Sequence, residues 1–241
     1  MSRFRYAVGE LAAAQKPARG VSLYSRYVNR PAGRLLAAAA YGARMSPNQV
    51  TAVSAVFTFT GVALIALLPP SRGLALVVFA ALVTGFALDS ADGQLARLTR
   101  RGGPAGEWLD HVVDCAKMLA LHTAVLVCFH RHFGFSDPVY LLIPLAFQFA
   151  AVTVFFGGVL TEQLKRNAAG SGTGVPAPPA PSMLRSVALL PVDYGLLCAV
   201  FLFLGDRELF LVLYCALLAA HLLFLPAFLA KWYRELSAPA R

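Results

Sequence analysis

Six long apolar runs limit what this chain can fold into. They cover residues 50–68, 74–95, 108–129, 139–160, 184–204 and 209–230. A helix needs about 20 mostly apolar residues to cross the hydrocarbon core of a bilayer. Hydrophobic residues make up 58% of the chain and charged residues only 14%, whereas about one-quarter of a soluble domain is charged. The sequence therefore predicts an all-α integral membrane protein with six transmembrane helices.

The distribution of positive charge indicates the topology. The net charge is +9, and most of the 21 Lys and Arg residues lie at the two ends of the chain, after the second apolar run and within residues 161–185. Cytosolic loops of membrane proteins are enriched in Lys and Arg. We therefore expect both termini in the cytosol, with the protein in the plasma membrane if it is bacterial. A membrane explains the basic charge, so no nucleic acid partner is expected.

The chain divides into three parts. Residues 1–48 form a basic N-terminal segment, residues 49–232 a six-helix membrane domain and residues 233–241 a cytosolic tail. Residues 22–44 mix aromatic residues and leucines with arginines, which is typical of an amphipathic helix lying on the lipid surface. Residues 161–183 carry glycine- and proline-rich sequence and are expected to form a flexible loop.

Four acids stand at the end of the second run and the start of the third: Asp89, Asp92, Asp110 and Asp114. A charge inside a membrane segment costs several kcal/mol and indicates a functional site. The spacings i,i+3 and i,i+4 place each pair on one helix face, and the short connection between them makes the two helices antiparallel neighbours. Clustered carboxylates repel one another unless cations neutralise them. Hard oxygen ligands suit Mg²⁺ or Mn²⁺, which are bound together with substrate phosphates.

Small residues and one cation lie between the two acidic pairs. Gly93 and Ala96 are small enough to let a bulky ligand approach the helix, and Gly106 permits close helix packing. Arg97 is a fixed cation beside the acids and suits a phosphate. These residues predict a phosphate or nucleotide pocket next to the metal site.

The combined pattern resembles the signature of the CDP-alcohol phosphatidyltransferase family. It reads Asp89-x2-Asp92-Gly93-x2-Ala96-Arg97-x8-Gly106-x3-Asp110-x3-Asp114. The segment from Ser46 to Thr51, with Pro47 and Asn48, also resembles the stretch that opens the first helix in many members. Outside residues 46–117 only the hydropathy pattern is similar.

This resemblance implies a transferase of the EC 2.7.8 type in phospholipid biosynthesis. Such an enzyme moves a phosphatidyl or other substituted phosphate group from a CDP-linked lipid, with CDP-diacylglycerol as the expected donor, to the hydroxyl of a small alcohol or phosphorylated alcohol. CMP is released. The resemblance also implies a homodimer and an active site on the cytosolic side.

Site roles follow from the same resemblance. Asp89, Asp92, Asp110 and Asp114 would bind Mg²⁺ or Mn²⁺, and Asp114 would also be the catalytic general base. The residues expected in the nucleotide and phosphate pocket are Thr51, Gly93, Ala96, Arg97 and Gly106.

Basic residues near the acids are candidates for binding the acceptor. Lys117 lies one turn beyond Asp114, where it either pairs with the acids or binds an anion. The further candidates are Lys165, Arg166 and Arg185, whose positions the expected topology explains equally well.

Two other classes remain open from the sequence. An intramembrane Mg²⁺-dependent prenyltransferase also uses paired acidic motifs, although on well-separated helices. A cation transporter would use buried carboxylates as its ion path, spread over several helices. In this chain all four acids lie on one helical hairpin. The acceptor, the lipid of the donor and the number of metal ions stay open.

Overall fold

The computed structural model describes residues 3–13, 22–170 and 183–237, and these residues form helices and connecting turns without a strand. The N-terminal helices are α1 (Arg3–Ala13), the π-helical η1 (Ser25–Asn29) and α2 (Arg30–Gly42). The long helices are α3 (Pro47–Leu67), α4 (Arg72–Thr99), α5 (Pro104–Cys128), α6 (Leu142–Gly170) and α9 (Arg207–Ser237). Shorter elements are η2 (Phe129–Phe133), η3 (Pro138–Leu141), α7 (Met183–Ala188), η4 (Leu190–Val192), α8 (Tyr194–Val200) and η5 (Phe201–Phe203).

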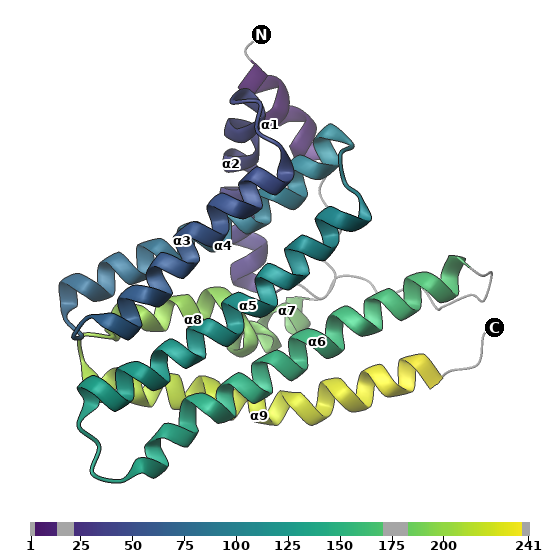
Figure 1. The fold of residues 1–241 in the computed structure, drawn as a ribbon. Coiled ribbons are helices and arrows are strands. Elements are labelled where there is room, and N and C mark those ends of the chain that lie inside the picture. The colour runs from purple at the N-terminus through teal and green to yellow at the C-terminus, as the bar shows by residue number, and fades with distance from the viewer. Residues whose placement is uncertain (1–2, 14–21, 171–182, 238–241) are drawn as a thin grey trace.

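Among the residues that the structure describes, five helical segments are long and apolar enough to cross a membrane. They are Pro47–Leu67, Arg72–Thr99, Pro104–Phe133, Pro138–Ala168 and Arg207–Ser237. In Figure 1, α3, α4 and α5 run side by side, and α6 and α9 form a second pair beside α5. The predicted all-α membrane fold is confirmed.

The fifth predicted span, residues 184–204, is not a single long helix. Its apolar helical part, Tyr194–Phe203, is shorter than a membrane span. Pro191 has no N–H to donate and cannot continue a helix from the preceding turn, and Asp193 starts a new helix by accepting a hydrogen bond from the Gly195 N–H at 2.7 Å. The expectation of six long helices is therefore corrected to five long helices and one broken segment.

The broken segment lies against α4. Its last turn, η5, packs on α4, and a Cβ at Gly205 would lie 2.6 Å from the Ser71 carbonyl carbon at the start of that helix. In the middle of the segment, at the start of α8, the buried Asp193 accepts hydrogen bonds from Ser22 and Ser25, the latter at 2.7 Å. The N-terminal segment is thus bonded into the bundle at the point where the helix is broken.

The N-terminal helices pack on the C-terminal half of α4. Ala37 and Ala38 of α2 and Ala7 and Leu11 of α1 share a core with Ala91 and Leu95 of α4. A Cβ on Gly33 would lie 2.7 Å from Ser90 Oγ, so glycine permits the close approach of α2 to α4. The lipid-surface location of residues 22–44 and the three-part division of the chain stay predictions.

Local sequence sets the ends of the helices that carry the acids. Ser46 and Gln49 form a capping box at the start of α3, with Pro47 in the first turn. α4 ends at Arg100, whose φ of 53° is left-handed, and Gly103 precedes Pro104 at the start of α5. This tight turn returns the chain antiparallel to α4.

Candidate metal centre

Three carboxylates meet between α4 and α5. One oxygen from each of Asp89, Asp110 and Asp114 lies within 4.8 Å of the others, and all three side chains are half-buried. Such a set from two rigid helices fits Mg²⁺ or Mn²⁺, because these ions prefer oxygen ligands and leave positions for substrate phosphates. The spacing argument from the sequence correctly placed these three acids together.

The fourth acid lies outside this set of three. Asp92 is 5% exposed, and its Oδ2 lies 2.6 Å from Thr51 Oγ1 on α3. The Thr51 hydroxyl also lies 3.2 Å from the Pro47 carbonyl oxygen. Thr51, which we expected in the nucleotide pocket, is therefore in direct contact with a predicted metal ligand and joins α3 to α4.

Lys117 lies in the middle of the acidic cluster. Its Nζ is 2.5 Å from Asp89 Oδ1 and 3.2 Å from Asp114 Oδ1. It is also 3.1 Å from Ser54 Oγ, and the lysine is only 5% exposed. The sequence left two roles open for Lys117, pairing with the acids or binding an anion, and in the structure it pairs with the acids.

The small residues of the motif lie near the end of α4 and the start of α5, and their place in a nucleotide pocket stays a prediction. A Cβ on Gly93 would lie 3.6 Å from Arg97 Nη1, so the guanidinium folds back beside this glycine toward the acids. A Cβ on Gly106 would lie 3.3 Å from Asn48 Oδ1, at the start of α3. Ala96 is half-buried one turn from the tight connection.

A row of arginines lies on the N-terminal helices, and one of them, Arg30, is close to α4. Arg26, Arg30 and Arg34 are spaced four apart and so follow one helix stripe. The Arg30 carbonyl accepts a hydrogen bond from Gln94 Nε2 at 3.1 Å, one turn before Arg97. Burial and the neighbouring charge of Arg26 lower the pKa of Arg30. The sequence analysis missed this row, although its i,i+4,i+8 spacing was readable.

Two of the remaining acceptor candidates are engaged in ion pairs at the ends of helices. Lys165 pairs with Glu235 of α9. Arg166 lies 2.6 Å from Glu107 and 3.1 Å from Glu162. The Arg185 side chain lies outside the described residues, although its backbone belongs to α7.

Tyr194 is a further residue that the sequence analysis did not single out. Its hydroxyl is enclosed and has no hydrogen-bond partner in the part of the chain that the structure describes. Its ring packs edge-on against Phe86 of α4, with ring centroids 5.1 Å apart.

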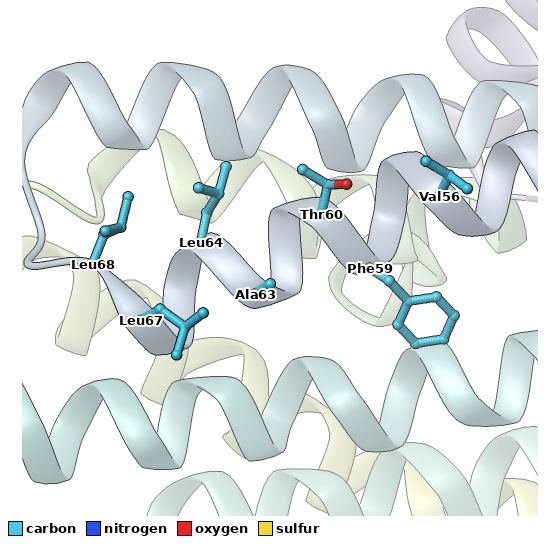
Figure 2. Close-up of a pocket in the computed structure, with 7 residues that line it drawn as sticks. All are labelled: Val56, Phe59, Thr60, Ala63, Leu64, Leu67 and Leu68. Carbon is cyan, nitrogen blue, oxygen red and sulfur yellow. The ribbon is translucent and has the colours of Figure 1, made fainter.

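An apolar recess of about 520 Å³ lies elsewhere, along α3. Figure 2 shows its lining side chains, which come from the middle and the C-terminal part of that helix and from its C-terminal cap: Val56, Phe59, Thr60, Ala63, Leu64, Leu67 and Leu68. It offers a single hydroxyl and no charge. The chemistry of the site therefore belongs to the acids and not to this recess.

The fold is that of a multi-pass membrane protein, and it brings together three carboxylates that can hold a metal ion. Comparison with protein families gives a more specific assignment, because the model of the CDP-alcohol phosphatidyltransferase family matches residues 44–227. The chain belongs to this family. No curated protein matches the sequence.

Membership confirms the resemblance seen in the motif. The family consists of membrane transferases of phospholipid biosynthesis that transfer phosphate-linked groups from a CDP-alcohol donor to an alcohol acceptor. Its members generally use divalent metals, and the cluster of Asp89, Asp110 and Asp114 can bind one. The intramembrane prenyltransferase and cation transporter alternatives lose their support.

Proposed function

We propose that this protein transfers the phosphatidyl group of CDP-diacylglycerol to the hydroxyl of a small alcohol or phosphorylated alcohol and releases CMP, as an EC 2.7.8-type enzyme. The observation that carries the proposal is the set of three carboxylates in a chain of this family. In the reaction, the acceptor oxygen forms a bond to the phosphorus that carries diacylglycerol. The bond from that phosphorus to the CMP oxygen breaks.

The three clustered carboxylates would hold Mg²⁺ or Mn²⁺, and Asp92 would join them or support them through the Thr51 contact. A bound divalent ion supplies charge stabilisation for the diphosphate oxygens and the leaving CMP. Asp114 is the proposed general base: its carboxylate takes the proton of the acceptor hydroxyl as that oxygen attacks. The proton leaves to solvent or to CMP afterwards.

The donor diphosphate would lie between the acids and the arginines. Arg97 sits beside Gly93, and Arg30 approaches from α2 next to Gln94. Guanidinium groups bind phosphate oxygens in bidentate fashion. We place the cytidine over Gly93, Ala96 and Gly106, where small residues leave room for a flat base.

The site is proposed to face the cytosol. The ion pairs of Arg166 with Glu107 and of Lys165 with Glu235 place the start of α5 and the ends of α6 and α9 together. The turn after α4 carries Arg100 and Arg101 to the same end, which agrees with the rule that basic residues stay on the cytosolic side. Both termini would then be cytosolic. A homodimer stays a prediction from the family resemblance.

The acceptor can be identified with purified protein in detergent. CMP release from CDP-diacylglycerol would be measured with Mg²⁺ or Mn²⁺ and a panel of glycerol 3-phosphate, inositol, inositol 1-phosphate, serine, ethanolamine and choline. The lipid product would be identified by mass spectrometry. Release with one acceptor and formation of the matching phospholipid supports the proposal. No release with any acceptor, while a prenyl diphosphate is consumed, would overturn it.

A further inference from the structure

Lys117 is held by a complete set of acceptors. An ammonium group has three N–H donors, and Lys117 Nζ has three partners: Asp89 Oδ1 at 2.5 Å, Ser54 Oγ at 3.1 Å and Asp114 Oδ1 at 3.2 Å. The lysine is 5% exposed, so water has little access to it. A charge this buried is retained only with such partners, because an unpaired buried ammonium is very unfavourable.

The Ser54 hydroxyl, an uncharged partner of Lys117, is itself fixed by the fold. Ser54 is fully buried on α3, and its hydroxyl donates to the Gly85 carbonyl oxygen at 2.8 Å. The donated hydrogen points away, so the remaining lone pairs of Ser54 Oγ can accept from Lys117. The two helices approach closely there, since a Cβ on Gly85 would overlap Thr58 Oγ1. Three helices, α3, α4 and α5, thus build this ammonium position.

The ammonium position overlaps a possible metal position. Asp89 and Asp114, the two acids that contact Lys117, belong with Asp110 to the set of three whose oxygens lie within 4.8 Å. In two-metal sites the ions lie about 3.5–4 Å apart and share such bridging carboxylates. A second ion on Asp89 and Asp114 would have to displace Lys117 and leave the buried ammonium with Ser54 but without its two carboxylate partners, which is strongly unfavourable.

We propose that the Lys117 ammonium takes the place of a second metal ion, so that this chain binds one divalent cation where its carboxylates could otherwise hold two. This inference rests on the proposed metal-dependent function. Each carboxylate has a second oxygen available for the single ion, with Asp110 completing the set. Lys117 is thereby a positioning residue: it holds the metal ligands Asp89 and Asp114 at a fixed separation and is not itself a metal ligand.

Metal stoichiometry tests the inference directly. Purified wild-type protein would be equilibrated with Mn²⁺, alone and with cytidine diphosphate added as a soluble diphosphate. Bound Mn²⁺ would be counted by elemental analysis and examined by electron paramagnetic resonance. We expect about one Mn²⁺ per chain with the signal of an isolated ion, because coupling needs a second ion at about 4 Å. Two coupled ions in either condition would overturn the inference.

The Lys117→Met variant supplies the second half of the test, with Lys117→Gln used if the first does not fold. Removing the ammonium should double the stoichiometry, to about two Mn²⁺ with a coupled spectrum. A variant that still binds one ion would contradict the inference. Lys165→Met removes the same charge from an ion pair outside the acidic cluster and should leave the count at one. Wild-type protein that binds no Mn²⁺ at all would instead count against the proposed function.

Discussion

Thr51 Oγ1 on α3 lies 2.6 Å from the buried Asp92 Oδ2 on α4. This contact connects the start of the first long helix to the acidic face of the second. The contact gives Thr51 a direct structural link to the acidic motif, although Thr51 and Asp92 are 41 residues apart in the sequence. Asp92 is thereby held apart from the three clustered carboxylates.

Loss of this hydrogen bond should weaken the site without unfolding the protein. Thr51→Val keeps the shape and removes the donor. We expect kcat/KM and Mn²⁺ affinity to fall by about 10- to 100-fold, as is typical when a partner of a metal-site carboxylate is lost. Thr51→Ser should retain most of both. Thr60→Val, a matched change in the apolar recess of the same helix, should have no effect on Mn²⁺ affinity, and an equal loss there would refute the specific role.

Asp110→Asn tests the membership of Asp110 in the metal site. An amide is a weaker ligand for a hard cation than a carboxylate, so Mn²⁺ affinity, measured by titration, should fall by more than about tenfold. Asp137→Asn is the control, because Asp137 is an exposed cap of η3. Unchanged Mn²⁺ binding in Asp110→Asn would remove this residue from the ligand set.

Asp193→Ala should destabilise the protein. The change removes a helix cap, worth about 1 kcal/mol, and the acceptor of two serine hydroxyls, each bond to a charged group being worth about 1.5–3 kcal/mol. The thermal midpoint in detergent should fall by several degrees. Asp137→Ala loses only an exposed cap and should shift the midpoint less. Equal shifts would mean that the Ser22 and Ser25 contacts contribute nothing.

Gly85→Ala should lower the stability of the protein, because the cost of the crowded side chain exceeds the gain in helix propensity. Alanine favours a helix over glycine by about 1 kcal/mol, but its Cβ would overlap Thr58 Oγ1 and lie 3.2 Å from the Ser54 carbonyl oxygen. Overpacking of this kind costs about 1–3 kcal/mol, so the thermal midpoint should fall. Gly73→Ala, in the first turn of the same helix with nothing within 4 Å, should raise it slightly. A rise in both variants would show that α3 and α4 are not in close contact.

Arg30→Ala should weaken donor binding. If the Arg30 guanidinium binds the donor phosphate as proposed, its loss should raise the KM for CDP-diacylglycerol by about 10-fold or more, because a charge-assisted hydrogen bond is worth about 1.5–3 kcal/mol. Arg72→Ala, at the other end of α4, is the matched control. If both variants keep the wild-type KM, Arg30 is not part of the donor site.

Much of this site could be predicted because local rules determine it. The i,i+3 and i,i+4 spacings and a tight turn suffice to bring Asp89, Asp110 and Asp114 together. The sequence could not separate Asp92 from them, because its partner Thr51 is 41 residues away. The Ser54 contact of Lys117 is likewise non-local.

Hydropathy predicted the wrong backbone where a proline and an aspartate interrupt an apolar run. Residues 184–204 are apolar enough for a span, yet Pro191 and Asp193 divide them into short helices. The signal was present in the Pro-x-Asp sequence, but its effect depends on Ser22 and Ser25 meeting the carboxylate.

Metal-dependent release of CMP from CDP-diacylglycerol by wild-type protein and by Asp114→Asn tests the central claim most directly. Asp206→Asn, an exposed helix cap at the start of α9, controls for loss of a carboxylate elsewhere. We predict release that requires Mg²⁺ or Mn²⁺ and an acceptor, persists in Asp206→Asn and falls at least about 100-fold in Asp114→Asn, as expected for loss of a general base. Release that is unchanged in Asp114→Asn, or independent of metal, would contradict the account.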